Sequence, residues 1–154
     1  IYVVVTVLFA PFSFGEIQVR VAEALTILPY FTPAAVPGLF VGCIIGNIIG
    51  VAILPDIIFG SLATLIGAVG TYLLRKHKFL MTLPPVFANM LIVPFVLRYG
   101  YGIAWEYNGV DMAIPFHALT VGAGEVISVC VLGSLLLKVL LPYKNILFRN
   151  ERER

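Results

Sequence analysis

Long apolar runs that carry almost no charge are the feature that most limits what this chain can fold into. The run at 112–141 holds two charged residues, Glu125 and Lys138, and the run at 56–74 holds only Asp56. About 20 consecutive apolar residues are enough to cross the ~30 Å hydrocarbon core of a bilayer as a helix. A membrane β-barrel would instead alternate apolar and polar residues in segments of about ten. Unbroken runs therefore predict an all-α, polytopic membrane protein.

The composition agrees with a membrane environment. Of the 154 residues, 60% are hydrophobic and 12% are charged, whereas about 25% of the residues in a typical soluble domain are charged. A soluble protein of this length has too little interior to hide so much apolar surface, so we take the lipid bilayer as its solvent.

Proline and charge divide the chain into six predicted transmembrane helices within one integral membrane domain covering 1–154. These helices lie at about 1–10, 17–31, 34–54, 56–74, 84–104 and 112–141, and a cytoplasmic tail is expected at 142–154. The first begins inside an apolar run, which is typical of a helix truncated at its N-terminus. Asp56 follows Pro55 and is expected to cap the fourth helix. Pro94 is expected to kink the fifth helix.

The distribution of lysine and arginine predicts the orientation. Six crossings place both termini and the loop near residue 76 on one side of the membrane. Eight of the ten basic residues fall on that side, leaving Arg20 and Arg98 on the other. Under the positive-inside rule both termini of this cell-membrane protein are then cytoplasmic. The same count favours 17–31 as a genuine crossing, because without it the basic clusters fall on opposite sides.

The segment 17–31 is unusually charged for a crossing. Glu16, Arg20 and Glu23 are spaced four and then three residues apart, which places them along one stripe of a helix. A helix lying on the membrane surface is one interpretation. Such helices usually carry several basic residues, so a stripe turned toward a cavity fits the mixed charges better. In that cavity Arg20 and Glu23 are expected to neutralise each other.

Three polar residues are predicted at membrane depth, where they are costly and often functional. Glu125 lies near the middle of the sixth helix, and Asn47 and Asn89 lie in the third and fifth. Each has two interpretations: a ligand contact, or a structural contact between helices. Gly42, Gly46 and Gly50 form a smooth helix face for close packing within the chain or against another subunit.

The sequence contains no motif that indicates an enzyme. Walker A, GxSxG and HExxH patterns are absent, and neither His77 nor His117 has an obvious catalytic partner. Neither Cys43 nor Cys130 has a histidine at metal-ligand spacing. We expect no cofactor, no metal and no nucleic-acid partner. If transport is driven by ATP, the ATPase is a separate subunit.

Four stretches carry a family resemblance: "APFSFGEIQVRVAEALTILPYFTPAAVPGLFVGCIIGN", "DIIFGSLATLIGAVGTYLL", "PPVFANMLIV" and "GAGEVISVCVLG". They resemble the QueT family from about Leu8 to Leu141. The resemblance implies a six-helix, substrate-binding S component of an energy-coupling factor (ECF) transporter. It further implies uptake of a queuosine precursor, a 7-deazaguanine, together with a membrane T component and two ABC ATPases.

Residues and resemblance together predict a polar pocket for a small heterocycle. Its predicted members are Gln18, Arg20, Glu23, Asn47, Asn89 and Glu125. Three alternatives remain: uptake of another vitamin-like compound by the same mechanism, a small secondary carrier that uses Glu125 as a proton relay, and a non-transport membrane subunit. Carriers usually pair two repeats, and this chain shows none, which disfavours the second.

Overall fold

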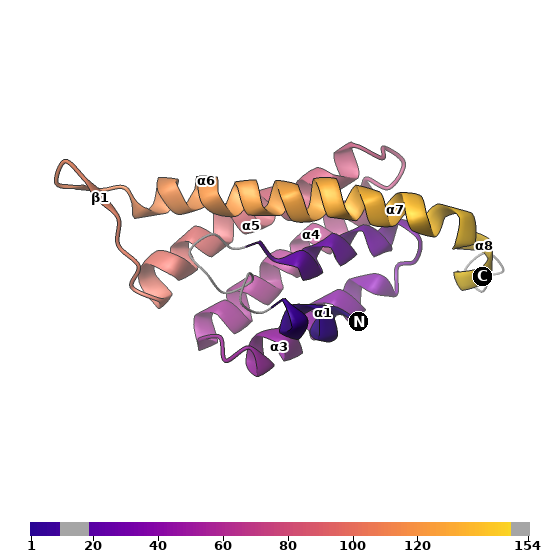
Figure 1. The fold of residues 1–154 in the computed structure, drawn as a ribbon, viewed down its shortest axis with the longest axis horizontal. Helices are drawn as coiled ribbons and strands as arrows, with labels where there is room; N and C mark the ends of the chain where they lie inside the picture. Colours follow the sequence, from indigo (N-terminus) through magenta and orange to yellow (C-terminus); the bar gives the residue numbers. More distant parts are fainter. Residues whose placement is uncertain (10–18, 149–154) are drawn as a thin grey trace.

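The computed structural model describes residues 1–9 and 19–148, which form a bundle of helices running along one common direction (Figure 1). The principal helices are α1 (Tyr2–Leu8), η1 (Val21–Tyr30), α3 (Ala35–Ile49), α4 (Ser61–Leu73), α5 (Leu83–Phe95), α6 (Ala113–Glu125), α7 (Ser134–Leu140) and α8 (Lys144–Leu147). Three π-helical segments extend them: η2 (Asp56–Gly60), η4 (Val96–Gly100) and η5 (Val126–Gly133). Two 3-10 turns, η3 (Leu80–Thr82) and η6 (Leu141–Tyr143), complete the helical set.

The predicted all-α membrane fold is confirmed. Three continuous helices are long and apolar enough to cross a membrane: Asp56–Leu73, Leu80–Gly100 and Ala113–Leu147. Val21–Tyr30 and Ala35–Ile49 are shorter apolar helices. The last helix does not end at Pro142, as the sequence suggested, because a single 3-10 turn carries it on into α8. Proline near the start of a helical turn is tolerated, since its missing N–H would have no partner there.

The predicted loop between the last two long helices contains a small hairpin. Strands β1 (Glu106–Tyr107) and β2 (Val110–Asp111) pair antiparallel across the turn residues Asn108 and Gly109, which both have positive φ. Such a turn favours the Asn-Gly pair, because these residues adopt positive φ at least cost. Trp105, just before β1, stacks on Phe116 of α6 with ring centroids 4.6 Å apart.

The hairpin is tied to the helices by Asp111. Its carboxylate accepts a hydrogen bond from the Ala113 N–H at 3.0 Å and another from Arg98 Nε at 2.6 Å. The backbone hydrogen bond from Ala113 and the one from Arg98 together hold the pKa of Asp111 below its usual value. We call this end of the bundle the hairpin end.

The opposite end of the bundle holds most of the described basic residues. Figure 1 shows the turn between α4 and α5, together with α8, at the end of the molecule away from β1. Arg75, Lys76 and Lys78 lie in that turn, and Lys144 begins α8. Helix η1 runs lengthwise along the bundle (Figure 1), and its crossing of the membrane stays a prediction.

Helix η1 is a 3-10 helix rather than an α-helix. A 3-10 helix rises about 2.0 Å per residue, so ten residues extend about 20 Å, against about 15 Å for an α-helix. This geometry lets a short segment traverse much of a membrane. It also aligns residues three apart, and Arg20, Glu23 and Thr26 are all buried along one line.

Small residues mark the closest helix contacts within the chain. A Cβ placed on Gly42 would lie 2.9 Å from Tyr2 Cβ, and one on Gly46 would lie 3.2 Å from Thr6 Oγ1. The glycine face of α3 is therefore covered by α1. On α4, a Cβ on Gly70 would overlap Pro84 Cβ of α5. Such approaches hold membrane helices together through van der Waals contact.

Candidate ligand-binding site

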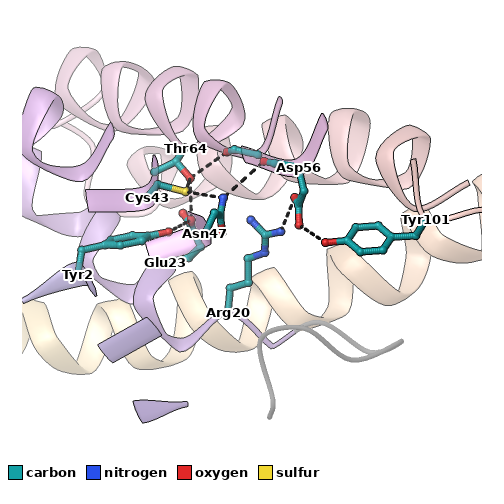
Figure 2. A network of polar contacts seen from close by, with 9 residues as sticks. Tyr2, Arg20, Glu23, Cys43, Asn47, Asp56, Thr64 and Tyr101 are labelled. Carbon is teal, nitrogen blue, oxygen red and sulfur yellow. Dashed lines mark hydrogen bonds and ion pairs between the residues drawn. The ribbon is translucent and has the colours of Figure 1, made fainter. Parts of the chain in front are cut away.

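The polar line on η1 lies inside the bundle. Arg20 is 5% exposed, and Glu23 and Thr26 are fully buried. The Thr26 hydroxyl donates a hydrogen bond to the Glu23 backbone carbonyl at 2.6 Å. This hydrogen bond therefore stays within η1. Arg20 and Glu23 instead reach other helices, and they form the centre of the network in Figure 2.

Arg20 pairs with Asp56, not with Glu23. Arg20 Nη2 lies 2.9 Å from Asp56 Oδ1, and both side chains are almost fully buried. The expected mutual neutralisation of Arg20 and Glu23 is therefore wrong, because Asp56 enters from η2 and supplies the counter-charge. Gly60 provides the space: a Cβ there would lie 2.9 Å from Asp56 Oδ1 and 3.2 Å from Arg20 Nη1.

Asp56 connects three parts of the molecule. Its Oδ2 accepts a hydrogen bond from the Tyr101 hydroxyl at 3.0 Å, from the hairpin end. Its backbone carbonyl accepts from Asn47 Nδ2 of α3 at 3.4 Å. The expected role of Asp56 as a helix cap is not observed, because its side chain makes no cap hydrogen bond. A buried carboxylate needs charged or donor partners, and Arg20 and Tyr101 meet that need better than a helix end.

Glu23 is held through one of its two oxygens. Oε1 accepts from the Tyr2 hydroxyl of α1 at 2.6 Å and from the Thr64 hydroxyl of α4 at 2.7 Å. Figure 2 shows these side chains converging on the carboxylate from different helices. The second oxygen, Oε2, is buried and has no partner among the described residues. Glu23 therefore uses Oε1 to hold neighbouring helices together, and its Oε2 remains free to accept a hydrogen bond from a ligand.

Asn89 of α5 and Glu125 of α6 supply further unpaired acceptors. Asn89 Nδ2 donates to the Pro85 carbonyl at 3.2 Å, which leaves its Oδ1 without a partner. Glu125 is 1% exposed, and its Oε2 is also unpaired. The Glu125 carboxylate is close enough to Asn89, Glu23 and Arg20 to interact with all three. Four of the six predicted residues are thus brought together.

The remaining two predicted residues behave differently. Asn47 contacts the network, but its amide nitrogen is directed at the Asp56 carbonyl and at Cys43 Sγ, 3.6 Å away. Gln18 lies outside the described residues. Ligand contact by either one stays a prediction.

Several buried polar atoms in the described part of the chain lack hydrogen-bond partners. They are Arg20 Nε and Nη1, Glu23 Oε2, Ser61 Oγ, Asn89 Oδ1, both ring nitrogens of His117, Glu125 Oε2 and Ser128 Oγ. Buried polar groups in folded proteins are nearly always paired, and an unpaired one costs about 1–3 kcal/mol. Water or a bound molecule completes such hydrogen bonds, and the unpaired atoms of Arg20, Glu23, Asn89 and Glu125 belong to side chains that interact with one another.

Sequence reasoning did not include Ser61, His117 and Ser128 among the candidate site residues, although each has a buried unpaired polar atom. Helical spacing was the available signal. His117 and Ser128 precede and follow Glu125 by eight and three residues, so they share its helix face. Ser61 follows Asp56 by five residues at the junction of η2 and α4.

The chemistry of the site favours a ligand rich in hydrogen-bond donors. Among residues 1–9 and 19–148, the buried carboxylates are Glu23, Asp56 and Glu125, and the buried guanidinium is that of Arg20. Asp56 pairs with Arg20, which leaves Glu23 Oε2, Asn89 Oδ1 and Glu125 Oε2 as the free acceptors. The described residues contain no group of histidine, cysteine or carboxylate side chains suited to a metal ion.

A separate groove of about 480 Å³ lies between η2 and α5–η4 and does not belong to this site. Its lining is apolar and includes Phe59, Leu91, Phe95 and Tyr99, all of them exposed on the outside of the bundle. None of the predicted ligand residues lines it. Exposed apolar side chains of this kind are expected where a membrane protein faces lipid.

The comparison with protein families decides the assignment. A family model described as QueT transporter matches residues 1–142, almost the whole described chain. The chain belongs to the QueT transporter family. The resemblance noted in the sequence is thereby confirmed, and a transporter with a small-molecule substrate follows from membership of the QueT family. No curated protein and no solved structure matched in the corresponding comparisons.

Proposed function

We propose that this QueT-family protein is the substrate-binding S component of an ECF-type importer and that it binds a queuosine precursor, a 7-deazaguanine. In this proposal a membrane T component and two ABC ATPases supply the energy. The family match supports the transport role. The buried cluster of unpaired polar atoms between η1, α4, α5 and α6 supports a small-molecule site inside this chain.

One observation carries the choice of ligand: Glu23 Oε2, Asn89 Oδ1 and Glu125 Oε2 are buried hydrogen-bond acceptors without partners. A guanine-type edge presents neighbouring ring and amino N–H donors in one plane. The three unpaired oxygens, one on each side chain, are acceptors suited to such donors. The free Nε and Nη1 of Arg20 are donors suited to the carbonyl oxygen of the same base. Donors and acceptors of the site thus complement those of the ligand.

We expect the purified chain, without partner subunits, to bind a 7-deazaguanine in a saturable 1:1 complex. Isothermal titration calorimetry in detergent micelles measures this directly, with adenine as a control that lacks the paired donors. Absence of binding by a monodisperse, folded sample would remove the substrate proposal. Uptake driven by a pH gradient into vesicles that hold this chain alone would instead support the secondary-carrier alternative.

The proposed orientation places the hairpin end outside the cell and the turn at 74–79 in the cytoplasm. The basic side chains of that turn, Arg75, Lys76 and Lys78, support this orientation through the positive-inside rule. In a variant with both native cysteines replaced, a cysteine at Asn108 is expected to react with an impermeant maleimide in intact cells. A cysteine at Lys76 is expected to react only after lysis. Labelling of Lys76→Cys in intact cells would reverse the orientation.

A further inference from the structure

His117 is a buried imidazole that no contact in the described structure explains. The residue is 2% exposed, and neither Nδ1 nor Nε2 has a hydrogen-bond partner. An imidazole has two polar positions, each of which donates or accepts a hydrogen bond. Burying both without partners is costly, so a purely structural role accounts poorly for a histidine at this place.

The side chain lies on the same face of α6 as Glu125. His117, Val121 and Glu125 follow one another at intervals of four residues, and all three are buried. At 1.5 Å per residue, the eight residues from His117 to Glu125 correspond to about 12 Å along the helix. The two polar groups therefore lie at different levels along the helix, so a ligand that meets both must carry polar groups at two separated positions.

The surface between the two polar residues is apolar. Val121 packs with Val93 and Leu97 of the neighbouring helix in one buried cluster. The ring of His117 itself lies edge-on to Phe116, with centroids 5.5 Å apart. Glu125 and His117 are thus two buried polar residues on one face of α6, separated by an apolar turn that packs against α5 and η4.

We propose that His117 is a specificity-determining contact at the hairpin end of the ligand site and that it hydrogen-bonds the polar substituent of the base. The proposal rests on the proposed function, and it assigns different parts of the ligand to Glu125 and to His117. Glu125 accepts hydrogen bonds from the ring and amino N–H groups. His117 contacts the substituent on the far side of the ring, which distinguishes precursors that share the same base edge.

The test compares three ligands on the same protein: 7-deazaguanine, its 7-cyano derivative and its 7-aminomethyl derivative. His117→Phe keeps a flat ring and removes both nitrogens. We expect it to raise the dissociation constant of the preferred substituted ligand at least about fivefold, the loss of one good hydrogen bond. The dissociation constant for unsubstituted 7-deazaguanine is expected to change less than about twofold. His117→Gln, which keeps a donor and an acceptor, is expected to restore part of the preference.

His77→Phe is the matched control, because His77 is the other histidine and lies exposed in the turn at 74–79. It should bind all three ligands as the wild-type protein does. Equal effects of His117→Phe on all three ligands, or no effect on any, would overturn the assignment of His117 and leave the proposed function standing. If the phenylalanine variant does not fold, His117→Leu, which also removes both ring nitrogens, takes its place, and an unchanged ligand preference in that variant overturns the assignment equally. Failure of the wild-type protein to bind any of the three would remove the proposed function and this inference with it.

Discussion

Arg20→Met is expected to lower the free energy of unfolding by about 3–5 kcal/mol, since it leaves the Asp56 carboxylate buried without its counter-charge. Asp56 is 1% exposed, so water cannot replace the guanidinium. Methionine fills similar space without a polar group. Denaturant unfolding of the purified protein in detergent measures the loss, with fluorescence of the single tryptophan, Trp105, as the signal.

A second pair in the same chain provides the control. Arg98 and Asp111 are 29% and 42% exposed at the hairpin end. Arg98→Met should cost less than about 1 kcal/mol, because exposed ion pairs contribute little. Adding Asp56→Asn to Arg20→Met should recover part of the stability, since the amide carries no charge and still accepts from Tyr101. Equal losses in Arg20→Met and Arg98→Met would show that the buried pair does not hold the helices together.

Glu125→Gln is expected to raise the dissociation constant for the deazaguanine about 10- to 100-fold, the usual effect of losing hydrogen bonds to a charged group. Its stability should stay the same or rise, because a buried amide costs less than a buried carboxylate with an unpaired oxygen. Calorimetry on the variant measures the first change, and denaturant unfolding measures the second.

Glu23→Gln should behave differently, and this contrast separates the roles of the two carboxylates. Oε1 of Glu23 accepts from Tyr2 and Thr64, so its replacement weakens contacts between α1, η1 and α4 as well as ligand binding. We therefore expect losses of both affinity and stability. Glu106→Gln, in the exposed hairpin, is the control that should change neither. Unaltered affinity in Glu125→Gln would remove Glu125 from the site.

The spacing of polar residues along the chain predicted which of their side chains point into the bundle. The spacing of Arg20 and Glu23 predicted a common polar line, and both are buried along η1. Glu125 was expected inside the bundle, and it is 1% exposed. A charged group at membrane depth must turn away from lipid, so burial follows from the residue type and its place within an apolar run.

The partners of those residues depended on the packing of distant segments. Asp56 is 36 residues from Arg20, and the whole of α3 lies between them in the sequence, so no local pattern predicted that they would pair. The sequence suggested Glu23 instead, because it is the nearest opposite charge along the chain. The 3-10 geometry of η1 was equally hidden, although it sets the line on which Arg20 and Glu23 face different helices.

The sequence by itself determined that the chain is an α-helical membrane protein and that Glu23 and Glu125 turn inward. These properties follow from hydropathy and residue spacing, which act within a segment. Only the tertiary structure decided that Arg20 joins Asp56, that Glu23 keeps one oxygen free, and that neither ring nitrogen of His117 meets a partner among the described residues. These contacts arise where helices far apart in the sequence pack together, and a buried polar group takes the partner that the packing brings within reach.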